Sequence, residues 1–206
     1  MVLFLFLSHL GIGVAFTLAF VSRQAGVKFF RFNAGLAAAM IAAGLAFQPI
    51  WPAAPADAPG ALRLAATALV WGCLAALVAY WLIVGRMLPA LRPILLSGAI
   101  ASGAAALVLQ SWLVAWDASS VKQALTALSF LTSAVFLGGA SSSMILGHWY
   151  LVIPSLDVAH LQSIVKLHIV SIVLRTVVVV AAVVLALWPA LSGVEGQPGL
   201  GVNFRR

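Results

Sequence analysis

Residues 164–188, IVKLHIVSIVLRTVVVVAAVVLALW, form a nearly unbroken apolar run whose only charged side chains are Lys166 and Arg175. A helix needs about 20 mainly apolar residues to cross the hydrocarbon core of a bilayer. Five further segments meet that requirement, at residues 2–21, 33–50, 62–84, 93–116 and 124–147. The sequence therefore predicts an all-α integral membrane protein, a bundle of six transmembrane helices that forms one polytopic domain over residues 1–206.

The composition excludes most soluble protein classes. Hydrophobic residues make up 64% of the chain and charged residues 7%, whereas soluble domains carry about 25% charged residues. The mean hydropathy is +1.16. So little polar side chain cannot cover the surface of a soluble enzyme of this size. The single cysteine, Cys73, lies in an apolar run, which excludes an internal disulfide and a cysteine-based metal site.

The basic residues predict the orientation of the helices. The loops on the side where the first helix ends, called side B, and the helix ends beside them contain Arg23, Lys28, Arg31, Arg86, Arg92 and Lys166. Apart from the tail with Arg205 and Arg206, the loops and helix ends of side A contain only Arg63 and Lys122. The positive-inside rule places side B in the cytoplasm, with both termini and the tail 189–206 outside. We therefore expect a multi-pass protein of the cell inner (plasma) membrane. Its net charge of +7 would meet anionic lipid rather than nucleic acid.

Arg175 is the most informative polar residue. It lies about eleven residues into the last span, roughly 16–17 Å deep, where an arginine costs at least about 2.5–3.5 kcal/mol. No Asp or Glu lies inside any of the six spans. Three partners remain open: carbonyls and hydroxyls of neighbouring helices, an anionic group of a cofactor, or an acid on another subunit.

A polar stripe extends along the same helix. His168, Ser171 and Arg175 fall within an arc of about 60°, and His168 and Arg175 are about 10 Å apart along the axis. His148 ends the fifth span on side B, where His168 enters the sixth. We expect these two imidazoles to face each other at similar depth, as iron ligation in a b-type haem requires. The spacing of about 10 Å between His168 and Arg175 also suits a quinone head group or a proton relay.

The remaining titratable residues give weaker signals. His9 is expected to bond to a neighbouring helix. Asp157 and His160, in the hairpin before the last span, could join another histidine in a metal site, although they match no recognised ligand spacing. The sequence contains no Walker, G-x-S-x-G, H-E-x-x-H or C-x-x-C-H motif. We therefore expect no catalysis by the chain alone.

These features favour an integral-membrane subunit of a multi-subunit electron-transfer complex, which binds or borders a b-type haem or a quinone near the cytoplasmic side. His148 and His168 would be ligands of the haem iron or quinone contacts, and Arg175 and Ser171 would contact the cofactor. Trp149 and Tyr150 would line its rim. Other membrane-protein subunits would carry the remaining redox centres. Two alternatives remain open: a structural or assembly subunit without a cofactor, and a transporter of small solutes or ions with Arg175 in its path.

Overall fold

The computed structural model describes residues 2–47, 58–86, 88–152 and 158–191. Its elements follow in chain order as α1 (Val2–Leu18), the 3-10 helix η1 (Arg23–Ala25), α2 (Gly26–Ala46), α3 (Gly60–Ile83), α4 (Leu91–Val114), α5 (Ser120–Val152) and α6 (Val158–Leu191). No strand occurs among the described residues. The predicted all-helical fold is confirmed.

The helices α2 to α6 are long and apolar enough to cross a membrane. The chain is therefore a multi-pass helical membrane protein. The first of the six predicted spans corresponds to α1, which is apolar but has only 17 residues. Its length of about 25 Å falls short of a hydrocarbon core about 30 Å thick.

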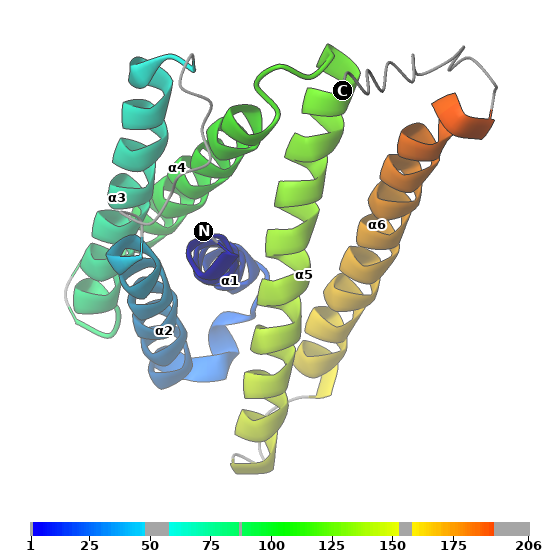
Figure 1. Ribbon diagram of the computed structural model, residues 1–206. Helices are drawn as coiled ribbons and strands as arrows, with labels where there is room; N and C mark the ends of the chain where they lie inside the picture. The colour runs from blue at the N-terminus through cyan, green and yellow to red at the C-terminus, as the bar shows by residue number, and fades with distance from the viewer. Residues whose placement is uncertain (1, 48–57, 87, 153–157, 192–206) are drawn as a thin grey trace, which may run out of the picture.

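Helix α1 lies at the centre of the bundle (Figure 1). It packs against α2 and α5 and more lightly against α4, while α3 packs against α4 and α2. The last helix, α6, packs against α5 and leaves a long apolar flank exposed, as a lipid-facing helix does. Because α1 is enclosed, its polar residues Ser8, His9 and Thr17 are buried. His9 and Thr17 have hydrogen-bond partners inside the protein, whereas the Ser8 hydroxyl has none among the described residues.

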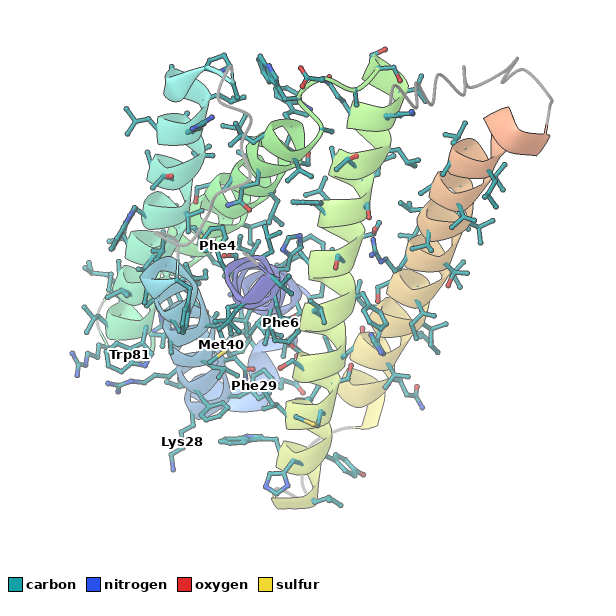
Figure 2. All side chains as sticks on the ribbon, in the orientation of Figure 1. Phe4, Phe6, Lys28, Phe29, Met40 and Trp81 are labelled. Carbon is teal, nitrogen blue, oxygen red and sulfur yellow. The ribbon has the colours of Figure 1, made fainter. Side chains whose placement is uncertain are left out.

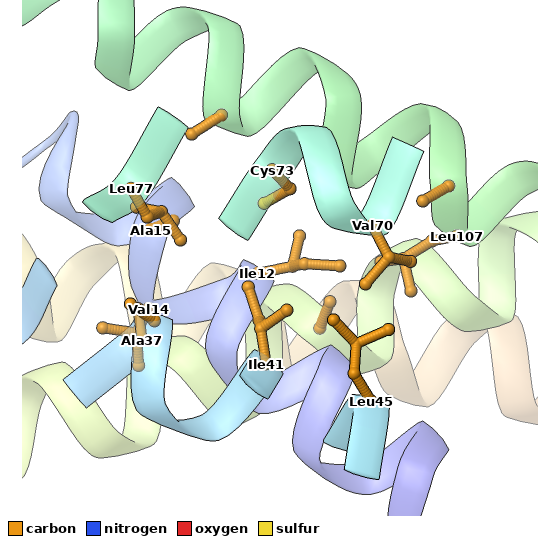
Figure 3. Close-up of a cluster of buried hydrophobic side chains, with 14 of the residues drawn as sticks. Ile12, Val14, Ala15, Ala37, Ile41, Leu45, Val70, Cys73, Leu77 and Leu107 are labelled. Carbon is orange, nitrogen blue, oxygen red and sulfur yellow. The ribbon is translucent and has the colours of Figure 1, made fainter. Parts of the chain in front are cut away.

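Two buried clusters hold the helices together. On side B, Phe29 of α2 (Figure 2) is fully buried. It meets Trp149 of α5 edge to face, with ring centroids 6.1 Å apart. In the middle of the bundle, side chains from α1, α2, α3 and α4 converge around Ile12, Ile41, Cys73 and Leu107 (Figure 3). The small residues among them, such as Ala15 and Ala37, let the helix axes approach closely.

Three helices extend beyond the predicted spans by five residues or more at one end. The segment 22–32, expected to be a connection, forms η1 and the first two turns of α2. Ser22 caps η1 by accepting a hydrogen bond from the Gln24 N–H. Likewise α5 continues to Val152 and α6 begins at Val158. Backbone hydrogen bonds continue wherever the residues tolerate a helix, so a helix can extend past the apolar run that crosses the lipid.

The closest backbone approach joins α1 to α5. A Cβ atom built on Gly138 would collide with the backbone of Gly13, and one built on Gly13 would collide with the carbonyl of Ala134. The two helices run in the same direction, because successive contacts pair His9 with Phe130, Gly13 with Ala134 and Gly138, and Thr17 with Ser142. Glycine at these two positions therefore sets the distance between the helices.

A buried hydrogen bond strengthens the same interface. The hydroxyls of Thr17 and Ser142 lie 2.5 Å apart. Thr17→Val keeps the shape and removes this bond, together with the bond that the Thr17 hydroxyl donates to the Val14 carbonyl of its own helix. We expect it to lower the unfolding free energy in mixed micelles by about 0.6–1.7 kcal/mol, the range of interhelical hydrogen bonds in membranes. The matched change Thr176→Val affects an exposed hydroxyl bonded within its own helix and should have no measurable effect. Equal stabilities of the two variants would contradict the prediction.

Candidate functional site

Arg175 points from α6 to α5, where Ser129 binds it. Its Nη1 atom donates to the Ser129 carbonyl at 2.8 Å and to the Ser129 hydroxyl at 2.6 Å. Of the three partners considered for this cation, the described residues supply the first: a carbonyl and a hydroxyl of a neighbouring helix. Arg175 therefore links the middle of α6 to the rest of the bundle.

His9 lies next to this link. The residue is 6% exposed, its Nδ1 atom lies 2.6 Å from the Leu5 carbonyl, and its ring meets that of Phe130 in a T-shaped arrangement with 4.9 Å between centroids. A carbonyl only accepts hydrogen bonds, so Nδ1 donates and Nε2 has no proton in the neutral ring. Arg175 also interacts electrostatically with this imidazole. Ser129 and Phe130 thus bring two basic residues, from α1 and α6, to one level of α5. His9 bonds within its own helix, not to a neighbouring one as expected.

The stripe predicted on α6 does face α5. The His168 ring stacks on Phe136 at 5.5 Å and 27°, and a Cβ atom on Gly139 would come within 3.0 Å of its Nδ1. Ser171 is buried; its hydroxyl donates to the His168 carbonyl at 2.6 Å and lies 3.4 Å from the ring. The absence of a side chain at Gly139 thus provides the space for His168.

The structure does not bring His148 to His168. His148 is exposed near the end of α5, nine residues beyond Gly139, which is about 13 Å along the helix axis. Metal–imidazole bonds are about 2 Å long, so two ligands of one iron must lie at the same level. Because α5 continues to Val152 and α6 begins already at Val158, His148 and His168 lie at different levels of the helix pair. This separation does not fit a haem held between the two histidines.

The residues expected around a haem rim have other neighbours. Trp149 and Tyr150 pack partly buried against the apolar cluster of side B. The Trp149 Nε1 atom is buried and has no hydrogen-bond partner among the described residues. Within the described ranges, no group of three or more His, Cys, Asp or Glu side chains could hold a metal ion. Asp157 and the side chain of His160 lie outside the described residues.

A cavity on side B brings together polar residues that the sequence analysis did not connect. The side-B cavity has a volume of about 360 Å³, within the usual range of small-molecule sites. Its polar residues are Arg23 after α1, Tyr80 near the end of α3, and Arg92 and Ser97 at the start of α4; its walls include the apolar side chains Leu18, Phe30, Val84, Leu96 and Ile100.

Not all polar atoms that line this cavity have a hydrogen-bond partner among the described residues. Arg92 donates from Nη2 to the Arg86 carbonyl at 3.2 Å, while its Nε is buried and has no partner among the described residues. Arg92 and Arg23 both interact electrostatically with the Tyr80 hydroxyl, and Tyr80 itself is 4% exposed. The cavity therefore combines positive charge, hydrogen-bond donors and apolar walls at one membrane surface.

The sequence contained a partial signal for this cavity. Arg23, Tyr80 and Arg92 all fall at side-B helix ends, so the predicted topology already put them on one surface. Which of them converge depends on the packing of α1, α3 and α4, and the pattern of one sequence does not specify this packing. No protein-family model, no curated protein and no solved structure matches the chain.

Proposed function

We propose that the chain is an integral-membrane subunit of a multi-subunit electron-transfer complex of the cell inner membrane, and that it binds a quinone in the side-B cavity near the cytoplasmic side. Both termini would lie on the opposite side of the membrane. The observation that carries the proposal is the pairing of two guanidinium groups and a buried phenol with apolar walls in one cavity. Partner subunits would supply the electron donor and acceptor.

The chemistry of the cavity suits this ligand class. A quinone head group presents two carbonyl oxygens that accept hydrogen bonds, and it carries an apolar ring and tail. The buried Arg92 Nε without a partner and the Tyr80 hydroxyl are donors of the required kind. Arg23 and Arg92 would also stabilise negative charge that develops on a reduced head group. The walls formed by Leu96 and Ile100 would cover the tail.

Quinone binding gives a direct test. The full chain, purified in mild detergent, should bind a short-tailed quinone in equilibrium dialysis. Arg92→Gln should weaken this binding about 10- to 100-fold, because hydrogen bonds from charged groups contribute about 1.5–3 kcal/mol. Arg86→Gln is the matched control: the Arg86 side chain is exposed on the same side and does not line the cavity, so its affinity should equal that of the wild type.

Two outcomes would exclude quinone binding at this site: no binding by the wild type, or equal affinities of Arg92→Gln and the wild type. Purification with the native partners adds a second measurement. Organic extracts of the complex should contain quinone, and extracts of the complex with Arg92→Gln should contain much less. Binding of anionic lipid in place of quinone, displaced by phospholipid but not by quinone, would also refute the proposal.

One observation favours a second candidate, a structural or assembly subunit without a cofactor. The Arg175 guanidinium is bound by Ser129, and the His168 ring is packed against α5. Neither group needs a ligand to explain its position. If this candidate is correct, Arg92→Gln should change neither the yield nor the spectrum of the complex, whereas Ser129→Ala, which leaves the Arg175 cation with one acceptor fewer, should lower the yield.

A further inference from the structure

A groove between α2 and α3 lies on the outer face of the bundle, apart from the side-B cavity. It consists of two adjoining hollows of about 510 Å³ and 350 Å³ that share Gly35, Ala39 and Trp81. We call this the α2–α3 groove; it extends from Lys28 to Ala42 on α2 and from Leu74 to Trp81 on α3. The hollow of about 350 Å³, which lies farther from Lys28, is lined only by apolar residues and glycine, except for the Trp81 indole.

The side-B end of the groove is positively charged. Lys28 and Arg31 line it, and the Arg31 guanidinium lies over the Trp81 ring at 5.3 Å from its centre. Such stacking orients a guanidinium. Lys28 extends from the lower end of α2, near Trp81 of α3 (Figure 2). Asp117 is the only carboxylate in the described part of the chain, and it lies on side A. The described residues on side B thus offer no acid to neutralise these cations.

The depth of the groove matches one leaflet of a bilayer. Lys28 and Ala42 are about 21 Å apart along the axis of α2. Half of a hydrocarbon core of about 30 Å is about 15 Å, which leaves the charged end at head-group level. Ala38, Ala39 and Ala42 leave room beside the helix for a narrow chain, and Val78 and Leu74 form the opposite wall.

We propose that the α2–α3 groove is a binding site for one anionic phospholipid. Lys28 and Arg31 bind its phosphate, and one acyl chain lies along the apolar floor between α2 and α3. Charge complementarity at the head group and the length of the apolar part both select this occupant. The site is independent of quinone binding, because its lining residues differ from those of the side-B cavity.

Native mass spectrometry of the full chain in mild detergent tests this site. The probes are phosphatidylglycerol and phosphatidylcholine with identical acyl chains. We expect phosphatidylglycerol to bind preferentially, and the double variant Lys28→Gln/Arg31→Gln to weaken its binding about 30-fold, because each basic residue near the surface contributes about fivefold. The control Arg86→Gln/Lys166→Gln removes two exposed charges from the same side and should keep the wild-type affinity.

A second variant tests the acyl chain with the charges intact. Ala39→Phe fills the groove at an exposed position of α2, so the lipid-free protein should unfold at the wild-type temperature while its phosphatidylglycerol affinity falls at least tenfold. Millimolar inorganic phosphate should not displace the lipid. The proposal is overturned if both lipids bind equally, if both double variants weaken binding equally, if Ala39→Phe has no effect, or if phosphate alone displaces the lipid.

Discussion

Gly138→Ala is expected to lower the unfolding free energy of the protein by about 3 kcal/mol or more. The added Cβ atom would collide with the backbone of Gly13, and a backbone inside a packed helix cannot rotate away as a side chain can. Overpacking of a core usually costs about 1–3 kcal/mol and more where a backbone must move. Because folded proteins are stable by only about 5–15 kcal/mol, we expect a marginal protein that is extracted in low yield.

The glycine Gly72 provides the matched control. It also lies within a helix, and a Cβ atom there would meet nothing within 4 Å. Gly72→Ala should therefore unfold at the same detergent concentration as the wild type or a higher one, since alanine favours a helix. Unfolding of both variants in mixed micelles, followed by tryptophan fluorescence, gives the comparison. Similar stabilities of Gly138→Ala and Gly72→Ala would mean that α1 and α5 do not approach as closely as described.

Ser129→Ala should have the second largest effect, a loss of about 1.5–3 kcal/mol of stability. The change removes the hydroxyl that accepts from Arg175 at 2.6 Å and leaves only the backbone carbonyl. Hydrogen bonds to charged groups contribute about 1.5–3 kcal/mol, and a cation inside a membrane has few substitute partners. Ser97→Ala, at an exposed hydroxyl bonded within its own helix, should change stability by less than about 0.5 kcal/mol.

A companion variant separates the charge from the hydrogen bond. Arg175→Met keeps a long apolar side chain and removes the cation, so it leaves no charge without its partner. We expect it to be more stable than Ser129→Ala and close to the wild type. The double variant Ser129→Ala/Arg175→Met should then match Arg175→Met, because the hydroxyl has no cation left to bind. An Arg175→Met protein less stable than Ser129→Ala would show that the guanidinium has stabilising partners besides Ser129.

Local periodicity predicted that three polar residues of α6 share one face. The 3.6-residue repeat of a helix places His168, Ser171 and Arg175 on one face, and that face packs against α5. The relative depth of His148 could not be predicted in the same way. It depends on how far α5 continues towards its end at Val152, and helical hydrogen bonds do not stop where the apolar run ends.

The sequence did not reveal which residues that are distant along the chain would come into contact. Nothing in the local pattern marks Ser129 as a partner of Arg175, and Arg92 served only as a topology signal. Their partners, Arg175 and the side-B cavity, come from segments tens of residues away. Only the packing of the helices against one another creates these neighbourhoods.

The sequence by itself determined that this protein is suited to lipid rather than to water, and that its secondary structure is helical. Long apolar runs can satisfy their backbone groups in lipid only as helices, so the membrane bundle follows from composition and length. The tertiary structure decided which polar groups meet. The contact of Gly13 with Gly138 sets how α1 lies on α5, and the resulting register brings His9 and Arg175 to one level. Such a register depends on the fit of two surfaces distant in sequence, whereas helix formation depends on hydrogen bonds four residues apart.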